Sequence, residues 1–291
     1  TYSITIKDKL SQINIKKSQI DSILVLVNNK FSTYDIDSEI SKINSNNSVN
    51  IHLSNDFSDL LNKALYYCDI SKGSYDITIG PLVKLWGFED IYKNNLPSKK
   101  NINKYLNNIG YNKISLLNNV LYKKNKNIKL DLNSIAKGYA VDKVYDYLKS
   151  LGCSNFLIEI GGELRSMGYD WIVGIQNPSS NDIIHKIKLA GMSMATSGTY
   201  NNFFIYNDTS YSHIINPKSG YPYEYSLLSA TIISKNCSDA DAYATMALTM
   251  QRSKFVDLTN KMTGIECYIV EVINNKINEY KSLNFDTFIT D

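Results

Sequence analysis

The sequence has few of the residues that crosslink, kink or loosen a chain. Its 291 residues include only 5 prolines, 14 glycines and 4 cysteines, while hydrophobic residues make up 43% and charged residues 20%. This composition excludes a collagen-like, disordered or disulfide-dense chain and is typical of a globular protein with a sizeable core. The cysteines, Cys68, Cys153, Cys237 and Cys267, match no zinc or redox spacing, so we expect buried, unpaired thiols.

An excess of one charge and long hydrophobic runs are also missing. The 31 basic and 28 acidic residues leave a net charge of +3, which is too weak and too interspersed to indicate a nucleic-acid groove. Apolar runs are short, 23–27 being typical, and none approaches the roughly 20 residues that cross a bilayer.

Common catalytic signatures are absent as well. The sequence has no G-x-G-x-x-G, Walker A, H-E-x-x-H or G-x-S-x-G motif, and only 3 histidines. Rossmann dehydrogenases, P-loop NTPases, zinc peptidases of that type and α/β hydrolases are therefore poor matches.

Hydrophobic periodicity predicts a mixture of helices and strands. We expect strands at 23–27, 128–132, 156–160, 171–175, 229–234 and 266–272, and helices at 58–68, 135–151, 238–250 and 253–262. Gly152 is expected to end one helix and Ser238 to cap another. The lysine- and asparagine-rich stretch 94–129 is expected to be an exposed, partly helical excursion. Because strands and helices do not alternate strictly, the predicted class is α+β, one compact domain that allows two lobes.

The first polar cluster is Asp131 to Gly138. Asn133 or Ser134 would cap the helix that follows, and Lys137 would add a positive charge one turn in. Such a helix end can bind phosphate. An ordinary capped helix with a solvated lysine is the alternative.

The second polar cluster is Ser238 to Thr245. Asp241 and Thr245 are four residues apart and therefore share one helix face. A carboxylate and a hydroxyl placed in this way can share Mg²⁺, which prefers oxygen ligands and completes its shell with water and phosphate. The alternative is that Asp239 and Asp241 only complement the helix dipole.

Two further clusters surround turns. His213 lies before a turn formed by Pro217 and Gly220, where it could act as a base near neutral pH or simply pack. The stretch 71–78, followed by Trp86 and Phe88, suits a flat ring or a corner of the core.

Taken together and in this order, the clusters resemble the ApbE-type FAD:protein FMN transferases. The resemblance covers nearly the whole chain, and seven short segments in the same order are specific although each one is weak. The matching segments are Ser32–Asp35 with Ser38–Ile40, Tyr75–Thr78 with Gly80–Leu82 and Trp86–Phe88, Asp131–Asp142, Ile160–Glu163, Ala195–Gly198, His213–Pro222 and Ala240–Thr245. The chain departs from the family pattern at Asn216 and Glu163, where aspartate is usual.

The resemblance implies one domain over 1–291 that acts as a magnesium-dependent enzyme. It would split FAD, attach FMN by a phosphoester bond to a Thr or Ser of an acceptor protein, and release AMP. The family pattern implies metal ligands at Asp241, Thr245 and the main-chain carbonyl of Ser134, and makes His213 the candidate base. It places FAD contacts, in a site between two lobes, on Tyr34, Ser74, Tyr75, Asp76, Asp131, Lys137 and Ile215.

Two other functions remain open from the sequence. Water could replace the acceptor hydroxyl, which would make the chain a magnesium-dependent FAD pyrophosphatase that yields FMN and AMP. The second open function is that of a non-catalytic flavin-binding protein at the cell surface. Such a protein has no need of Asp241, Thr245 and His213 together. By resemblance we also expect an extracytoplasmic, membrane-anchored lipoprotein whose acceptors are membrane-associated redox subunits, and a chain that starts at Thr1 is compatible with a trimmed signal.

Overall fold

The computed structural model describes residues 1–8, 15–88, 96–169, 171–180, 182–200, 203–207, 209–223, 227–274 and 276–290. The chain forms two compact units. Unit 1 contains Thr1–Val27, Ser134–Gly198 and Ser226–Asp291, and unit 2 contains Asn28–Asn133 and Thr199–Tyr225. Both units combine helices with antiparallel strands, which confirms the predicted α+β class.

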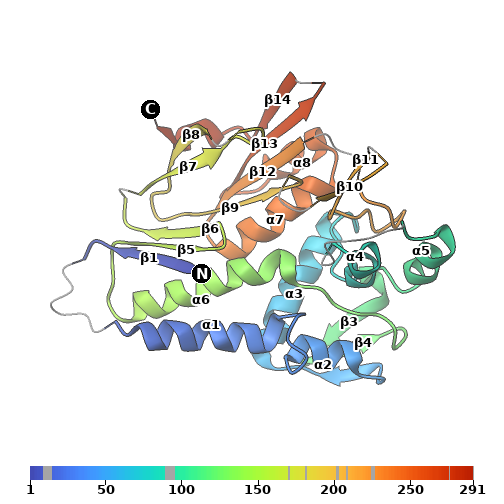
Figure 1. Ribbon diagram of the computed structural model, residues 1–291. Helices are drawn as coiled ribbons and strands as arrows, with labels where there is room; N and C mark the ends of the chain where they lie inside the picture. Colours follow the sequence, from blue (N-terminus) through green and yellow to red (C-terminus); the bar gives the residue numbers. More distant parts are fainter. Residues whose placement is uncertain are drawn as a thin grey trace. The chain divides into compact units, whose positions relative to one another are not determined.

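Unit 1 is built on a seven-stranded sheet in the order β1-β5-β6-β9-β12-β13-β14, and all its neighbours pair antiparallel (Figure 1). The strands are β1 (Tyr2–Ile6), β5 (Phe156–Ile160), β6 (Glu163–Met167), β9 (Ser193–Gly198), β12 (Leu227–Ser234), β13 (Ile265–Ile273) and β14 (Lys276–Lys281). A second sheet contains β7 (Ile172–Gln176), β8 (Ile183–Lys188) and β15 (Ile289–Thr290), and a 3-10 helix, η3 (Phe285–Phe288), precedes β15.

The two faces of the large sheet have different partners. Helices α6 (Asn133–Ser150) and α7 (Cys237–Thr249) lie on one face, as Figure 1 shows, and the β7–β8 sheet packs on the other. Because strand side chains alternate, Phe156 and Ile158 face α6 while Leu157 joins the opposite cluster. Helix α8 (Arg252–Thr259) also belongs to unit 1, as do the residues of helix α1 (Lys17–Phe31) up to Val27.

Unit 2 is mainly helical. Its helices are α2 (Glu39–Ser45), α3 (Asn55–Ile70), α4 (Gly80–Trp86), α5 (Lys99–Leu106) and the 3-10 helix η2 (Tyr111–Lys113). Its strands are β2 (Asn50–His52), β3 (Ile114–Leu117) and β4 (Val120–Lys123), in the order β2-β4-β3, and the hairpin β10 (Phe203–Tyr206) and β11 (Thr209–Ser212). Trp86 is buried in a core that also contains Leu82, Ile102 and Ile215.

The predicted strand at 23–27 is wrong, because these residues belong to α1. Ile20 and Val27 are buried and Ile23 and Leu24 pack against the same cluster as Ile20, whereas Val25 is 53% exposed. Buried positions at this spacing are helical, and a run of five apolar residues cannot by itself distinguish a helix from a strand.

The predicted strand at 128–132 is also wrong, because Leu130 pairs with a side chain in place of a neighbouring strand. The Asn44 amide donates to the Leu130 carbonyl at 2.8 Å and accepts from the Leu130 N–H at 2.7 Å. Ser238 does not cap its helix either: α7 begins at Cys237 after the N-cap residue Asn236.

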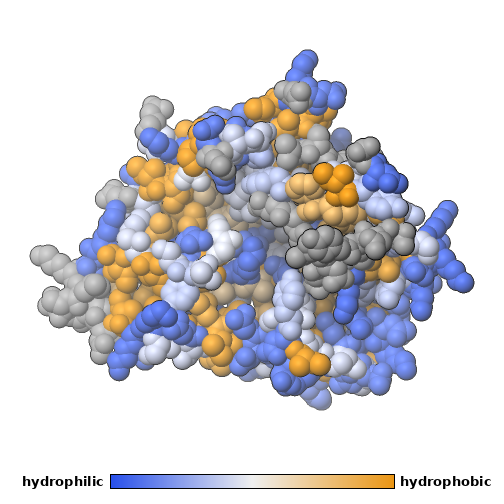
Figure 2. Space-filling model, viewed as in Figure 1, coloured by the Kyte–Doolittle hydropathy of each residue, from blue (hydrophilic) through white to orange (hydrophobic). Residues whose placement is uncertain are grey.

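The stretch 94–129, which was predicted to be an exposed excursion, is exposed only in part. Residues 94 and 95 lie outside the described residues. It forms α5, β3 and β4, and Figure 2 shows hydrophilic residues over these elements. However, Ile102, Ile114 and Leu121 are buried beneath that surface.

The remaining helix and strand predictions are confirmed to within a few residues. Helix α6 ends before Gly152, whose φ of +87° fits the predicted left-handed stop. All four cysteines are buried and unpaired, as expected. No helix in the described ranges is long and apolar enough to span a bilayer.

Candidate active site

Asp241 connects the two helices that carry the predicted metal ligands in unit 1. It is 3% exposed in the first turns of α7, and its Oδ2 accepts a hydrogen bond from the Gly138 N–H of α6 at 2.9 Å. In an α-helix the N–H of a residue faces the carbonyl four positions earlier, which here is that of Ser134. The Asp241 carboxylate therefore lies beside the helical turn that carries Ser134.

Gly138 is required at this contact, a role that no local pattern in the sequence indicates. A Cβ at Gly138 would meet the Cys237 carbonyl oxygen at 2.3 Å. Only glycine lets α6 and α7 approach so closely.

The burial of Asp241 also changes its acidity. Burial raises the pKa of the Asp241 carboxyl, while the charge of Lys137 and the Gly138 hydrogen bond lower it.

Thr245 follows Asp241 by one turn of α7 and is half-buried, whereas Ala244 and Met246 beside it are buried. Its hydroxyl lies 3.4 Å from the Ser197 hydroxyl of β9. The hydroxyl of Thr245 and the carboxylate of Asp241 are thus on neighbouring turns of one helix.

These donors fit Mg²⁺ better than a transition metal. A carboxylate, a hydroxyl and a main-chain carbonyl are all hard oxygen ligands, and Mg²⁺ usually takes few ligands from the protein. The described part of the chain contains no group of three or more His, Cys, Asp or Glu that could hold a metal. With only three protein ligands, a cation at Asp241, Thr245 and the Ser134 carbonyl would keep room for water and phosphate.

Lys137, the predicted phosphate contact, forms an ion pair with Glu163 of β6. The Lys137 side chain is 52% exposed but that of Glu163 is 3% exposed, and Glu163 Oε2 has no hydrogen-bond partner among the described residues. Burial and the nearby charge of Asp241 raise the pKa of Glu163 to about 7, although Lys137 opposes this shift. Glu163 therefore forms a charged cluster with Lys137 and Asp241. In the sequence, the Gly161-Gly162 pair just before Glu163 is the feature that marks this position.

Asp76 and its neighbours form an anchored loop in unit 2. Asp76 Oδ1 accepts from the N–H and the hydroxyl of Thr78 at 2.9 and 2.6 Å, and Oδ2 accepts from the Tyr111 N–H at 2.9 Å. Burial raises the pKa of Asp76, and these hydrogen bonds oppose the shift. Tyr75 is buried against Tyr67, while Ser74 is half-buried. The geometry gives Asp76 and Tyr75 structural contacts and leaves Ser74 more accessible.

Asp131 lies against the same loop. Its N–H donates to the Ile77 carbonyl at 2.7 Å, and its Oδ1 accepts from the Asn133 N–H at 2.9 Å. A Cβ at Gly80 would approach the Asp131 Cβ to 3.2 Å. The side chain that accepts from the first N–H of α6 is therefore that of Asp131. The sequence had instead predicted Asn133 or Ser134 as the cap.

His213 and Ile215 follow β11 in unit 2. The half-buried His213 ring is edge-on to Phe88, with centroids 6.4 Å apart, whereas Ile215 is 4% exposed and packs in the core around Trp86. The Trp86 indole N–H donates to the Gly220 carbonyl at 2.8 Å. The buried side chain of Ile215 leaves mainly its main chain to contact a ligand. Of the two interpretations of the stretch that ends at Trp86 and Phe88, the core corner is correct for Trp86.

Tyr34, the last predicted contact, is 76% exposed in the connection between α1 and α2. The predicted residues therefore divide into two sets, one in each unit. Unit 1 brings together Ser134, Lys137, Asp241 and Thr245, and unit 2 contains Tyr34, Ser74, Tyr75, Asp76, Asp131, His213 and Ile215.

Comparisons with known proteins agree with the sequence resemblance. A model of the ApbE family matches residues 1–269. An FAD:protein FMN transferase of Vibrio cholerae is 33% identical over 94% of this chain and 84% of its own length, and one of Haemophilus influenzae is 33% identical over 91% and 81%. The solved flavin transferase ApbE of Vibrio cholerae aligns with a TM-score of 0.90 at 30% identity, over 99% of this chain and 95% of its own.

Proposed function

Because the chain belongs to the ApbE family, we propose that it is a magnesium-dependent FAD:protein FMN transferase that works as one functional domain over 1–291. It would cleave FAD, attach FMN by a phosphoester bond to a Thr or Ser of an acceptor protein, and release AMP. The expectation of an enzyme of this family is already confirmed by its relatives; the metal, the acceptor and the residue roles are the proposal.

One observation carries the assignment of the cation site: the hydrogen bond from the Gly138 N–H to Asp241 Oδ2. It brings a buried carboxylate to the turn of Ser134 and leaves Thr245 one turn farther along α7. We assign the cation to Asp241, Thr245 and the carbonyl of Ser134. A divalent cation bound there would draw negative charge from the FAD pyrophosphate.

Lys137 would bind the pyrophosphate from α6. Its side chain is half-exposed, and its ammonium group has Glu163 as its partner. Phosphate oxygens bind ammonium groups by charge-assisted hydrogen bonds, so Lys137 can contact FAD while Glu163 holds its side chain on the same side of α6. The FAD contacts of unit 2 are assigned to the accessible Tyr34 and Ser74, to the loop held by Asp76 and Asp131 with Tyr75, and to the main chain at Ile215.

His213 would take the proton of the acceptor hydroxyl as its oxygen bonds to the phosphorus of the FMN phosphate. The bond from that phosphorus to the bridging oxygen breaks, and AMP leaves with the electron pair. A hydroxyl is a weak nucleophile unless a base removes its proton in the transition state. His213 is half-buried beside Phe88, which limits the movement of its ring.

We also propose a localisation, which the family resemblance supports. The acceptors would be membrane-associated redox subunits with an FMN-binding Thr or Ser motif. The protein would act outside the cytoplasm as a membrane-anchored lipoprotein. Incorporation of radiolabelled palmitate into the full-length protein, together with membrane fractionation, tests this part independently of the chemistry.

The test of the reaction is an incubation with FAD and Mg²⁺, with and without a candidate acceptor domain that contains the threonine motif. FMN, AMP and flavin-labelled protein are then separated. We expect covalent flavin and AMP in equal amounts when the acceptor is present, and neither in EDTA. Release of free FMN with no labelled acceptor would instead indicate the pyrophosphatase.

The variant for the same test is Asp241→Asn, which keeps an acceptor oxygen for Gly138 but removes the charge. We expect it to lose cation-dependent FAD cleavage. Asp239→Asn, two residues away on α7 and half-buried, is the matched control and should retain activity. Full activity of Asp241→Asn with an unchanged Mg²⁺ dependence would exclude Asp241 as a metal ligand.

A further inference from the structure

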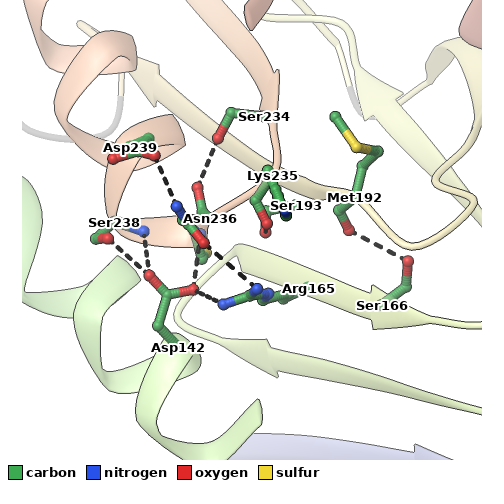
Figure 3. A network of polar contacts seen from close by, with 11 residues as sticks. Asp142, Arg165, Ser166, Met192, Ser193, Ser234, Lys235, Asn236, Ser238 and Asp239 are labelled. Atoms are coloured by element: carbon green, nitrogen blue, oxygen red, sulfur yellow. Dashed lines mark hydrogen bonds and ion pairs between the residues drawn. The ribbon is translucent and has the colours of Figure 1, made fainter. Parts of the chain in front are cut away.

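Asp142 of α6 forms the N-terminal cap of a different helix, α7 (Figure 3). Its carboxylate accepts from the Cys237 N–H at 2.8 Å, from the Ser238 N–H at 2.9 Å and from the Ser238 hydroxyl at 2.6 Å. The first N–H groups of a helix have no acceptor within the helix, and a negative charge there also complements the helix dipole. Asp142 therefore fixes where α7 begins relative to α6.

Arg165 of β6 holds Asp142 in this position. Figure 3 shows its guanidinium group beside the carboxylate, with which it forms an ion pair. The guanidinium also lies 3.7 Å from the centre of the Tyr145 ring and donates to Asn236 at 3.4 Å. Because the two charged side chains are only 9% and 14% exposed and guanidinium geometry is rigid, the sheet fixes the orientation of the cap.

A second contact runs between the same helices in the opposite direction. Asp241 of α7 accepts from the Gly138 N–H of α6 at 2.9 Å. Gly138 and Asp142 are four residues apart and so lie on one face of α6. Each helix thus contributes one carboxylate to backbone N–H groups of the other, and the tight approach of Gly138 to Cys237 joins a member of each contact.

We propose that Asp142, held by Arg165, is a positioning residue that sets the spacing between Asp241 and the turn of Ser134, and thereby the affinity of the cation site. The inference rests on the proposed function, which supplies that site. Groups that orient metal ligands without touching the metal typically change metal affinity by about 10- to 100-fold when replaced. We expect a loss in that range on removal of the Asp142 charge.

The experiment measures Mn²⁺ affinity by electron paramagnetic resonance, with the whole chain and no FAD. The variants are Asp142→Asn, Asp142→Asn with Arg165→Met, and the milder Ser238→Ala, which removes one donor to Asp142. The double variant avoids a buried arginine without its carboxylate, a defect that can itself unfold a protein. We expect the first two to bind Mn²⁺ about 10- to 100-fold more weakly and Ser238→Ala to show a smaller loss in the same direction.

A matched control distinguishes positioning from general loss of stability. Arg252 and Glu271 form another ion pair in unit 1, 8% and 14% exposed, with Nη2 and Oε1 3.5 Å apart. Glu271→Gln should lower the free energy of unfolding but keep wild-type Mn²⁺ affinity. An equal loss of affinity in Glu271→Gln would overturn the positioning role, as would wild-type affinity in both Asp142→Asn and Ser238→Ala.

Failure of the underlying cation site has a different signature. If the wild-type protein binds no Mn²⁺, or if Asp241→Asn binds it as tightly as wild type does, the site itself is wrong and the inference falls with it. If Asp241→Asn loses Mn²⁺ while the Asp142 and Ser238 variants keep it, only the inference is overturned.

Discussion

The two units carry their predicted functional residues on different kinds of structure. In unit 1 these residues lie on α6 and α7, which approach closely at Gly138 and are joined by the buried carboxylate of Asp241 and the half-buried one of Asp142. In unit 2 they lie in connections, such as the loop around Asp76 and the chain after β11. The predicted metal and phosphate residues thus lie on helices, which hold side chains at fixed distances, whereas the predicted base and flavin contacts lie mainly in loops and turns.

The predicted residues also differ in how completely their polar atoms are paired. In unit 2 both oxygens of the Asp76 carboxylate accept hydrogen bonds, from Thr78 and Tyr111, whereas His213 is half-buried. In unit 1 the buried Glu163 retains one oxygen without a partner among the described residues. Substitutions in the two units should therefore differ in whether they change rate, stability or pH dependence.

The largest effect is expected in unit 2 from His213→Ala. Because a positioned base contributes roughly 10² to 10⁴ in rate, the variant should label an acceptor more slowly by that factor while binding FAD normally. The measurement is the rate at which covalent flavin fluorescence appears on the acceptor in a denaturing gel. His52→Ala, an exposed histidine of β2 in the same unit, is the control. A wild-type rate for His213→Ala would make it a packing residue.

The second effect should be on stability and concerns Asp76→Asn. Asparagine has one acceptor oxygen where aspartate has two, and its amide nitrogen only donates. It therefore cannot accept from both Thr78 and Tyr111, and an N–H that loses its partner costs about 1 to 3 kcal/mol. Urea unfolding measures this cost, with the exposed Asp59→Asn of α3 as control. A large loss of rate with an unchanged free energy of unfolding would show that Asp76 is catalytic.

The third effect concerns the pH dependence of unit 1. Because burial and Asp241 raise the pKa of Glu163 to about 7 from 4.5, the folded chain keeps a proton that the unfolded chain releases between these values. The free energy of unfolding should therefore fall as pH rises from about 4.5 to 7 and then level. Glu163 should contribute about 3 kcal/mol to this fall.

Glu163→Gln cannot titrate and should lose that part of the slope. The measurement is urea unfolding at pH 5 and pH 8 in EDTA, which keeps divalent cations from changing the charge balance. Parallel stability curves for the variant and the wild-type protein would contradict the assignment.

The smallest effect is expected from Lys137→Ala. A half-exposed charge is worth up to about 1 kcal/mol, so FAD affinity should fall about two- to fivefold at low ionic strength and less at high salt. Lys149→Ala, an exposed lysine in the last turn of the same helix, should change nothing. Equal FAD affinity at every salt concentration would mean that Lys137 serves only its ion pair with Glu163.

Local sequence patterns determined much of the secondary structure. The apolar spacing in α3 and α6, the stop at Gly152, and the β-branched residues of β13 each act within one element. The same holds for Asp241 and Thr245, because a separation of four residues places both on one helix face. The run at 23–27 failed for the complementary reason: five apolar residues fit either a helix or a strand.

The contacts that turn these elements into a site are long-range, and only the tertiary structure decided them. Gly138 and Asp241 are 103 residues apart, Asp142 and Ser238 are 96 apart, and Trp86 and Gly220 are 134 apart. No local periodicity encodes which carboxylate meets which N–H group, because that depends on how helices pack on a sheet and how closely two backbones approach. The sequence alone determined which residues carry charge and which helix face they share; packing decided that Asp142 caps a distant helix and that Glu163 is buried beside Lys137.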